Sequence, residues 1–517
     1  MATDIGKLFR STEELPGPVV AQVTGQLPNW LQGDFYSIGP ALFDLNKEFT
    51  VNHWCDGFGV VYKFSIRDGN VEFKKKFIES DAYKKAKKVG KPVYTEFGTK
   101  AYSDTTKNLF QKLVTNVMPE LTDNEAGTIY CLGKTLYVGT ESHYKRKLDP
   151  QTLETGEKVD LSQILKLNLS CSHIYNDPNG NAAYTMGTVL SSGLKSQIIK
   201  INLKDALPGQ EYKNGSVVAT IPCRWRTTIS YSHSFGISQN YVVYIDQPLF
   251  MAGVKLLTAH VKGHCMIDCM EWKPEEKNHF VVVDKETGDV SSILYESAEA
   301  FFFFHHINTY QIGQELVVDV VAHNSPEVIK YMYLNKLRNA ELILKDQGNA
   351  RRFVLPLIKN IKEVPENENL IKCNSNAKAV RKGNRIIVTS TDVTEPAYDF
   401  PTVNPAYFGK RYTYFYASGN YTQSQFRNSV LKVNVDTGEI KTWKESELVF
   451  PAEPLFVASP GCKAEDDGVL LVGVTNLEKD GKDFLLILDA TDLHELARAT
   501  VNAHVPFLLH TTFLPVI

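Results

Sequence analysis

Residues 301–310 combine an unbroken apolar run with a pair of histidines and read Phe-Phe-Phe-Phe-His-His-Ile-Asn-Thr-Tyr. Four consecutive aromatic residues predict a strand buried on both faces, because a half-exposed strand would alternate apolar and polar positions. Burying His305, His306 and Asn308 is costly unless each finds a hydrogen-bond partner or a metal ion. This stretch alone therefore fits hydrogen-bonded core histidines and metal ligands equally well.

Apolar strands alternate with polar turns along the whole chain. Predicted strands flank turns built on Asp with Gly, Asn or Thr at 60–66 and 71–77, at 280–283 and 289–295, and at 430–435 and 439–443. Hairpins spread over the full length, with few helical stretches between them, predict an all-β fold with radial repetition, a seven-bladed β-propeller. A set of stacked β-sandwich domains is the alternative.

The length of the chain indicates how the blades are elaborated. Seven blades would share 517 residues, about 74 each, whereas simple blades need only ~40–50. Long insertions are therefore expected to cap one face of the propeller. No linker rich in Pro, Gly or Ser divides the sequence, which favours a single domain over residues 1–517.

Two segments break the β pattern. In residues 107–118, Leu109, Phe110 and Leu113 fall with further apolar residues on one face of a predicted helix. Residues 248–270 are apolar but contain Lys255 and Lys262, a pattern typical of a segment that lies in a membrane interface. The pattern leaves core packing and membrane docking open for both segments.

Charge and apolar content narrow the class of protein. The 56 basic and 59 acidic residues give a net charge of -3 and are well mixed along the chain, so we expect no nucleic-acid partner. The first residues contain no apolar run long enough for a signal peptide, and no run of ~18 apolar residues would span a bilayer. We therefore expect an intracellular protein whose eight cysteines are reduced.

Four of the 13 histidines share a setting beside apolar or aromatic strands: His173, His233, His305 and His510. Their successive separations of 60, 72 and 205 residues are close to one, one and three blade lengths. This spacing predicts that each lies at the inner end of a different blade, where strands converge on the propeller axis. Neutral imidazole nitrogens gathered there suit iron, copper, zinc or nickel.

Motifs spread over nearly the whole chain are specific in combination. They are Gly-Asp-Phe-Tyr-Ser-Ile-Gly-Pro from residue 33, His-Trp-Cys-Asp-Gly from residue 53, Arg-Arg-Phe-Val-Leu-Pro-Leu from residue 351, Ala-Glu-Pro from residue 452, Glu-Asp-Asp-Gly from residue 465 and Pro-Phe-Leu-Leu-His from residue 506. With them the sequence resembles the animal branch of the carotenoid cleavage oxygenases. The resemblance implies a seven-bladed propeller with a helical and loop cap over the face that contains an axial ferrous iron.

The resemblance also assigns the iron ligands, which would be His173, His233, His305 and His510. In the pair at 305 and 306, the family's ligand lies three residues before the asparagine, which selects His305 over His306.

Further positions match family residues around the iron. Glu141, Glu453 and Asp399 match carboxylates that accept the second N–H of an iron-bound imidazole. Asp399 stands where the family usually has Glu, so we expect it to need a small backbone shift or a bridging water to reach its histidine. Thr140 matches the residue that crowds one open iron position, and Phe97 matches a substrate-facing position, although Phe97 also fits ordinary core packing.

The resemblance implies a dioxygenase that cleaves a carotenoid, such as zeaxanthin or β-carotene, to retinal-type aldehydes. Within the animal branch it is strongest to the insect carotenoid isomerooxygenases, which implies that one half of the substrate also changes from all-trans to 11-cis. Phe97 and residues 329–333 are expected to shape the tunnel for that half. The implied location is the cytoplasm, with peripheral attachment to membranes.

Three other functions stay open: a retinyl ester isomerohydrolase, an eccentric-cleaving dioxygenase, and a propeller that acts only as an interaction scaffold. Against the isomerohydrolase, the family's Asp-Pro-Cys-Lys reads Asp-Thr-Thr-Lys from residue 104 here, so the lipidatable cysteine is missing. Four histidines at ligand positions argue against the scaffold.

Overall fold

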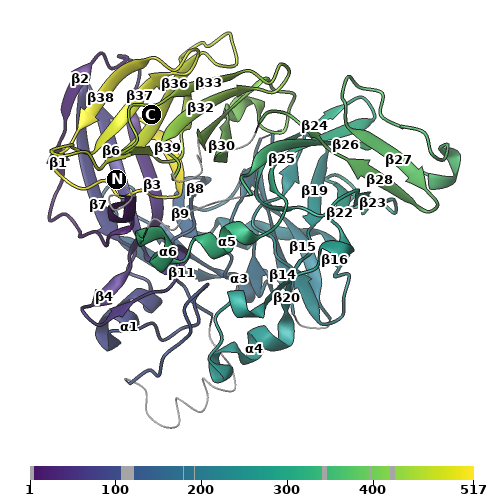
Figure 1. The fold of residues 1–517 in the computed structure, drawn as a ribbon, viewed down its shortest axis with the longest axis horizontal. Coiled ribbons are helices and arrows are strands. Elements are labelled where there is room, and N and C mark those ends of the chain that lie inside the picture. Colours follow the sequence, from purple (N-terminus) through teal and green to yellow (C-terminus); the bar gives the residue numbers. More distant parts are fainter. Residues whose placement is uncertain are drawn as a thin grey trace.

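Seven sheets of four to six strands repeat a hairpin-based unit in the computed structural model (Figure 1). The structure describes residues 5–105, 121–178, 180–190, 193–339, 346–395, 398–419 and 426–516. Within these ranges the seven sheets form the blades of a β-propeller, which confirms the predicted fold. The predicted amphipathic segment 107–118 lies outside the described residues.

The first four blades start in chain order, but the first and the fourth also take in strands from later in the chain. The first contains β1 (Val19–Val20), β3 (Gly33–Leu42), β6 (Phe58–Arg67), β7 (Asn70–Phe77) and β39 (His510–Pro515). The second contains β8 (Thr128–Leu132), β9 (Thr135–Gly139), β10 (Tyr144–Leu148) and β11 (Thr155–Asp160). The third contains β12 (Leu169–Ser170), β13 (Tyr175–Asn176), β14 (Ala182–Val189), β15 (Lys195–Asn202) and β16 (Gly215–Pro222). The fourth contains β18 (Gly236–Ile237), β19 (Tyr241–Asp246), β22 (His279–Asp284), β23 (Leu294–Ser297), β27 (Lys378–Lys382) and β28 (Arg385–Thr389).

The last three blades complete the ring. The fifth contains β24 (Phe302–Ile312), β25 (Glu315–His323), β26 (Asn349–Pro356) and β29 (Thr391–Asp392). The sixth contains β30 (Tyr398–Val403), β31 (Tyr414–Gly419), β32 (Ser429–Asn434) and β33 (Ile440–Trp443). The seventh contains β2 (Gln22–Gly25), β34 (Val449–Pro451), β35 (Leu455–Ala458), β36 (Gly468–Asn476), β37 (Phe484–Asp489) and β38 (Glu495–Thr500).

The two ends of the chain close the ring by strand pairing. Near the N-terminus, β2 pairs with β38 of the seventh blade, and near the C-terminus β39 pairs with β3 of the first blade. Figure 1 shows these purple and yellow strands beside one another. Backbone hydrogen bonds between the two ends therefore hold the first and last blades together.

The strand predicted from the aromatic run is β24, in which residues 302–310 are all buried. The hairpins predicted around residues 67–70 and 436–438 are β6–β7 and β32–β33. The strand predicted at 289–295 is wrong in its extent, since β23 begins only at Leu294. Before it, Val290 makes an isolated bridge with Val283, and β23 then takes a second, parallel partner in β28.

The remaining strands and α-helices lie in the connections between blade strands, and together they are called the cap here. They are the three-stranded sheet of β17 (Thr228–Ser230), β20 (Leu249–Ala252) and β21 (Met270–Trp272), the two-stranded sheet of β4 (Asp44–Asn46) and β5 (Phe49–Thr50), and the helices α1 (Asp81–Val89), α3 (Leu161–Ile164), α4 (Gly253–Lys262), α5 (Glu327–Tyr331) and α6 (Leu334–Arg338). One apolar cluster joins Leu249 and Met251 of β20 and Ile329 of α5 to Phe302 and Phe304 of β24. Part of this cap thus covers the end of β24 that carries the two histidines.

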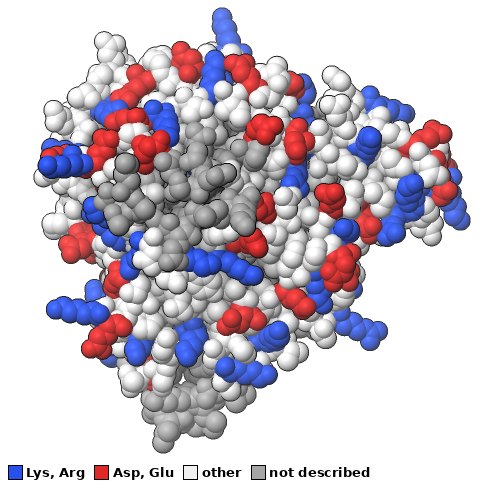
Figure 2. Space-filling view, in the orientation of Figure 1, with Lys and Arg blue, Asp and Glu red and all other residues white. Residues whose placement is uncertain are grey.

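The segment 248–270 is divided between core and surface. Leu249, Phe250 and Met251 of β20 are buried, as is the inner side of α4, whereas Val254 and Val261 are 64% and 63% exposed. The helices in the described part of the chain are too short or too polar to cross a bilayer. On the face shown in Figure 2, basic and acidic side chains are interspersed, as their mixing in the sequence predicts.

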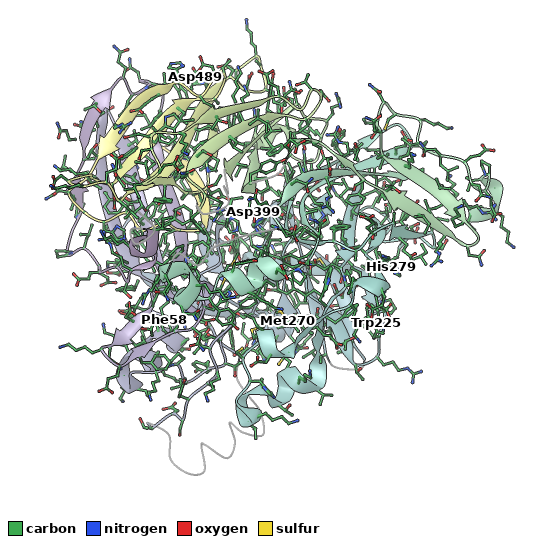
Figure 3. All side chains as sticks on the ribbon, in the orientation of Figure 1. Phe58, Trp225, Met270, His279, Asp399 and Asp489 are labelled. Atoms are coloured by element: carbon green, nitrogen blue, oxygen red, sulfur yellow. The ribbon has the colours of Figure 1, made fainter. Side chains whose placement is uncertain are left out.

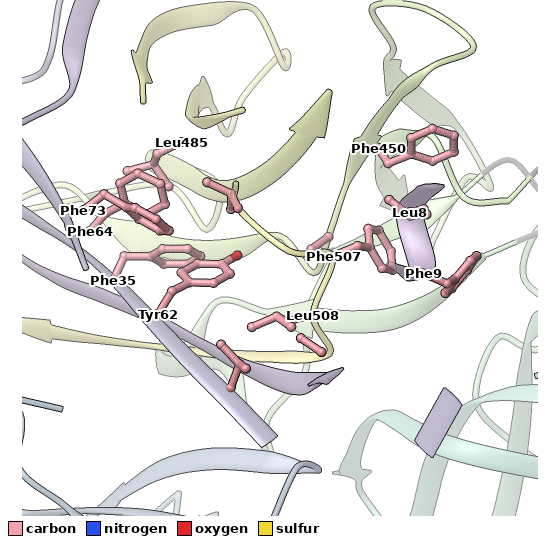
Figure 4. Packing of buried hydrophobic residues seen from close by; sticks show 14 of the residues in the cluster. Leu8, Phe9, Phe35, Tyr62, Phe64, Phe73, Phe450, Leu485, Phe507 and Leu508 are labelled. Carbon is pink, nitrogen blue, oxygen red and sulfur yellow. The ribbon is translucent and has the colours of Figure 1, made fainter. Parts of the chain in front are cut away.

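An apolar cluster joins the first and seventh blades, the pair that closes the ring. Figure 4 shows Phe35, Tyr62, Phe64 and Phe73 of the first blade packed near Leu485 of the seventh. At Gly473 in β36, a Cβ atom would lie 2.0 Å from the hydroxyl oxygen of Tyr62, which is fully buried. Only glycine lets these two blades approach so closely.

Gly473→Ala should therefore lower the free energy of unfolding by about 1–3 kcal/mol, the usual cost of an overpacked core. Tyr62→Phe removes the clashing hydroxyl, so the double variant should lose less than the sum of the two single variants. Chemical denaturation of the four proteins measures this coupling. Gly17→Ala, where nothing lies within 4 Å of the added Cβ, is the control, and strict additivity would contradict the proposed contact.

Candidate metal centre

Four histidines meet at the propeller axis from four different blades. His173 lies between β12 and β13 of the third blade, and His233 lies between the cap strand β17 and β18 of the fourth. His305 belongs to β24 of the fifth blade, and His510 is the first residue of β39 in the first. One nitrogen from each ring lies within 4.8 Å of the other three. The structure thus brings together all four histidines that the sequence singles out.

The facing atoms are Nε2 nitrogens. His173 Nε2 is 3.3 Å from His233 Nε2, and His305 Nε2 is 3.3 Å from His510 Nε2. First-row metals bind imidazole nitrogen at about 2.0–2.1 Å, so two ligands at right angles on one ion would be about 3 Å apart. The spacing of the cluster fits a single metal ion.

Three of the rings hydrogen-bond to carboxylates through their other nitrogen. The Nδ1 atom of His233 is 2.5 Å from Glu141 Oε1, and that of His510 is 2.8 Å from Glu453 Oε1. His305 Nδ1 is 2.7 Å from Asp399 Oδ1. An ionised carboxylate only accepts hydrogen bonds, so each Nδ1 carries the proton. Each Nε2 of a neutral ring then presents a lone pair to the axis, as a metal ligand must.

The electrostatics favour neutral rings and ionised carboxylates. Burial lowers the pKa of His305 to about 4, although the neighbouring Asp399 opposes this shift. Burial and the three other ligand-position histidines lower the pKa of His173 well below its usual value. Burial raises the pKa of Asp399, but its interaction and hydrogen bond with His305 outweigh this effect, and the net shift is downward. Four lone pairs that face one another without a shared proton repel unless a cation lies between them.

Glu141 is held by more than its histidine. Its Oε1 also accepts a hydrogen bond from the Tyr231 hydroxyl at 3.0 Å, and its Oε2 accepts one from Thr140 Oγ1 at 3.1 Å. Burial acts to raise the pKa of Glu141, but its interaction with His233 and the hydrogen bonds from His233 and Tyr231 lower it to about 2. Thr140, expected to crowd an open metal position, thus also orients the carboxylate behind His233.

Glu453 is fixed by its neighbour on β39. Its Oε2 accepts hydrogen bonds from both the backbone N–H and the hydroxyl of Thr511, each at 2.7 Å. One carboxylate therefore binds the ring of His510 and the backbone of the next residue. This arrangement sets the direction of the His510 ring relative to its own strand.

Asp399 reaches His305 directly, without the bridging water considered from its sequence. A β-bulge lies between Asp399 and Thr402, and Phe400 takes a left-handed backbone conformation with φ +56°. The Phe400 N–H donates to Asp399 Oδ1 at 2.8 Å. That this distortion is the backbone shift expected for the shorter carboxylate stays a prediction. Figure 3 labels Asp399 near the middle of the view.

Two residues at the centre were not expected from the sequence. The ring centroid of Phe400 is 5.0 Å from that of His305 and 5.2 Å from that of His510. The guanidinium of Arg427, almost wholly buried, lies 4.0 Å from the centroid of Phe400. The only signal for Phe400 was its position after Asp399, and none pointed to Arg427.

His306 faces away from the cluster. Its Nδ1 is 3.1 Å from the hydroxyl oxygen of Ser234, which also accepts the backbone N–H of His306. Ser234 gives its own proton to the carbonyl of Phe304. The sequence left open whether this pair consists of core histidines or metal ligands. His306 is a hydrogen-bonded core histidine, and His305 belongs to the metal-ligand cluster.

Phe97 lies in the apolar cap rather than against the four histidine rings of the metal site. It is partly buried and packs on the cluster that contains Phe304, Tyr231 and Ile329. The ring of Phe304 is 5.4 Å from that of His233. A cluster of packed apolar side chains thus links the metal site to Phe97.

His305→Ala should lose the metal, because it removes one of four nitrogens from the cluster. His306→Ala should keep it, since His306 Nδ1 bonds only to Ser234. Iron content after anaerobic reconstitution with ferrous iron measures both variants. A His305→Ala protein with one iron per chain would refute the ligand set.

Comparison with known proteins supports these assignments. A profile of the retinal pigment epithelial membrane protein family matches residues 8–515. The β,β-carotene 15,15'-dioxygenase of Gallus gallus is 36% identical over 518 residues, which cover 98% of this chain and 97% of the relative. The mitochondrial carotenoid-cleaving dioxygenase of Mustela putorius furo is 34% identical over 531 residues, which cover 99% and 96%.

The fold has a full-length counterpart among solved structures. Cobalt-substituted apocarotenoid oxygenase of Synechocystis superimposes with a TM-score of 0.79 at 22% identity, covering 100% of this chain and 99% of the other. The four-histidine cluster is typical of the ferrous iron site of carotenoid oxygenases. Because the family profile and relatives of about one-third identity span nearly its whole length, the chain belongs to the retinal pigment epithelial membrane protein family of carotenoid cleavage oxygenases.

Proposed function

We propose that this protein is an iron(II) dioxygenase that splits a central carbon–carbon double bond of a carotenoid into two retinal-type aldehydes. The carrying observation is the cluster of four histidines, three of them hydrogen-bonded to carboxylates, beside a cluster of packed apolar side chains. The Gallus gallus and Mustela putorius furo relatives are named as carotenoid dioxygenases. The reaction balances with one dioxygen molecule, because the double bond breaks and each aldehyde receives one oxygen atom.

Ferrous iron bound by His173, His233, His305 and His510 would supply the activation of dioxygen, since four protein ligands leave positions open on the ion. The protein residues hold the geometry. Glu141, Asp399 and Glu453 keep three rings in the tautomer that presents Nε2 to the axis. Thr140 is held by its hydrogen bond to Glu141, which fixes where its methyl group can limit access.

The apolar cluster suits a polyene. The ring of Phe304 lies 5.4 Å from that of His233, Tyr231 packs on Phe304, and Phe97 belongs to the same cluster. A pocket beside Glu141 and Tyr231 is lined by Met186, Met251 and Met266, whose flexible side chains fit apolar ligands of varied shape. These residues would bind the hydrocarbon chain, keep water away and orient one double bond toward the metal. Phe97 would face the substrate at a distance from the cleaved bond.

Cleavage is coupled to isomerisation of one half from all-trans to 11-cis in this proposal. Its support is the sequence resemblance to the insect isomerooxygenases. Isomerisation requires the polyene to lose bond order while it is held, and the shape of one half of the tunnel then traps the bent product. Binding along the half that does not bend would offset that strain.

Substrate entry from a membrane surface completes the proposal. A carotenoid is stored in apolar phases, so the protein would bind peripherally to lipid. Val254 and Val261 of α4 lie seven positions apart on the helix, both exposed, beside Lys255 and Lys262. Exposed apolar side chains flanked by cations are typical of interfacial helices. Leu109, Phe110 and Leu113, outside the described residues, are expected to add to this surface.

Incubation of the iron-loaded protein with zeaxanthin or β-carotene under air and dim light should give one all-trans and one 11-cis retinoid aldehyde. Chromatographic analysis of retinoid isomers measures the products, and His305→Ala is the metal-free control. Two all-trans halves in equal yield would refute the isomerisation but keep central cleavage. Products of unequal length would instead establish eccentric cleavage.

Liposome flotation tests the membrane surface. The double variant Val254→Asp, Val261→Asp should float less than the wild type, because each aspartate places a charge where an apolar side chain would enter the lipid. Val20→Asp, which changes a valine 71% exposed in the first blade, is the matched control. Equal flotation of the wild type and the α4 variant would rule out docking through this helix.

A further inference from the structure

The motif His-Trp-Cys-Asp-Gly from residue 53 takes no part in the metal site, yet it is among the most buried polar segments of the protein. It forms the short 3-10 helix η2 (Trp54–Asp56) between β5 and β6, and both His53 and Asp56 are 0% exposed. Buried polar side chains are kept only where their hydrogen bonds are made. The partners of these two side chains therefore indicate what the motif does.

Asp56 binds the irregular segment that carries Phe97. Its Oδ1 accepts the backbone N–H of Gly98 at 2.8 Å, and its Oδ2 accepts the hydroxyl of Thr99 at 2.6 Å and the backbone N–H of His53 at 3.1 Å. A Cβ at Gly98 would lie 2.5 Å from the Cβ of His53. Glycine at 98 thus lets the segment pack directly on the motif.

His53 binds the opposite segment, at the end of α5. Its Nδ1 accepts the backbone N–H of Cys55 at 3.1 Å, so its proton lies on Nε2, which donates to the carbonyl of Ile329 at 2.9 Å. Burial lowers the pKa of His53 to about 4, which keeps the ring neutral and this tautomer fixed.

Backbone hydrogen bonds extend the second attachment. The Trp54 N–H donates to the carbonyl of Met332, and the Leu334 N–H donates to the carbonyl of Asn52, each at 2.8 Å. The loop between α5 and α6 is thereby tied to the motif on both sides of Tyr333.

The two segments place one aromatic ring each against the His53 imidazole. The centroids of Phe97 and Tyr333 are both 5.2 Å from that of His53, at interplanar angles of 61° and 86°. From the sequence we expected Phe97 and residues 329–333 to shape the tunnel from two sides. The structure shows both of them packed on a single buried ring.

The Phe97 segment is also fixed from the cap. The N–H of Ile267 donates to the carbonyl of Phe97 at 2.9 Å, and the N–H of Met266 donates to that of Glu96 at 3.1 Å. Met266 also lines the pocket beside Glu141. A displacement of the Phe97 segment would therefore be passed to the wall of the pocket nearest the metal site.

We propose that His53 is a positioning residue that holds Phe97 and the α5–α6 loop at a fixed separation and so determines which double bond of the polyene lies over the metal. This inference rests on the proposed carotenoid cleavage. His53 itself touches neither the metal ligands nor their carboxylates. Its influence on the reaction passes through the two aromatic rings and the backbone that carries them.

The test compares His53→Ala with His53→Gln, whose side-chain amide can still donate to the Ile329 carbonyl. We expect both variants to bind one iron per chain, because all four ligands are intact. In His53→Ala, kcat/KM should fall by roughly 10- to 100-fold, mainly through KM, since small misplacements are costly and binding is lost before chemistry. The products of His53→Ala should include aldehydes from cleavage at neighbouring double bonds. His53→Gln should cleave at one double bond, like the wild type.

Tyr333→Ala is a second test that leaves the motif intact. Its products should also include aldehydes from cleavage at more than one double bond. His504→Gln, at a histidine that bonds to Asp483 in the seventh blade, is the control and should resemble the wild type. Cleavage at one double bond with the wild-type KM in both His53→Ala and Tyr333→Ala would overturn the proposal. If His53→Ala does not fold, the Tyr333→Ala product pattern decides alone.

Hydrogen exchange of the substrate-free protein separates this inference from the proposed function. Loss of the His53 contacts should speed exchange at residues 97–99 and 329–334 together in His53→Ala. If the wild type cleaves no carotenoid, the proposed function fails, while joint exchange still supports the attachment of both segments to His53. Unchanged exchange in either segment would overturn the attachment itself.

Discussion

Four imidazoles whose Nε2 atoms lie 3.3 Å apart in two pairs, with one nitrogen of each within 4.8 Å of the others, are the constraint on which the rest of the structure depends. Their lone pairs repel unless a cation lies between them, and they remain lone pairs only while the rings are neutral. The carboxylates at Glu141, Asp399 and Glu453 secure this by accepting the Nδ1 protons. Burial then keeps water from competing for either ring nitrogen. The charge, tautomer and orientation of His233, His305 and His510 are therefore set together.

This constraint explains why a closed ring of seven blades suits the site. Each blade supplies one group: His510, Glu141, His173, His233, His305, Asp399 and Glu453, in order from the first blade to the seventh. His510 comes from β39, which joins the first blade only when the C-terminal end of the chain pairs with β3. The full set therefore exists only in the closed propeller. A metal bound by that set stabilises the folded state over open forms.

The sequence predicts those features that local patterns encode. The aromatic run before His305 identifies the buried strand β24, and recurring hairpins identify the blades, because burial and turns depend on neighbouring residues. It does not predict partners distant in the chain. The parallel pairing of β28 with β23 has no local signal, although it adds to the fourth blade a hairpin that lies in the sequence between β26 and β29 of the fifth. The two rings on His53 were missed for the same reason.

Phe400 shows how the short side chain of Asp399 reaches its histidine. Asp399 contacts His305 at 2.7 Å from a strand that bulges between Asp399 and Thr402. A left-handed phenylalanine costs roughly 1–3 kcal/mol. The hydrogen bond from its N–H to Asp399 and the cation of Arg427 over its ring, about 2 kcal/mol when desolvated, offset a cost of that size. Because the same ring packs on His305 and His510, the distortion that lets the short carboxylate reach its histidine also fixes two of the four imidazoles.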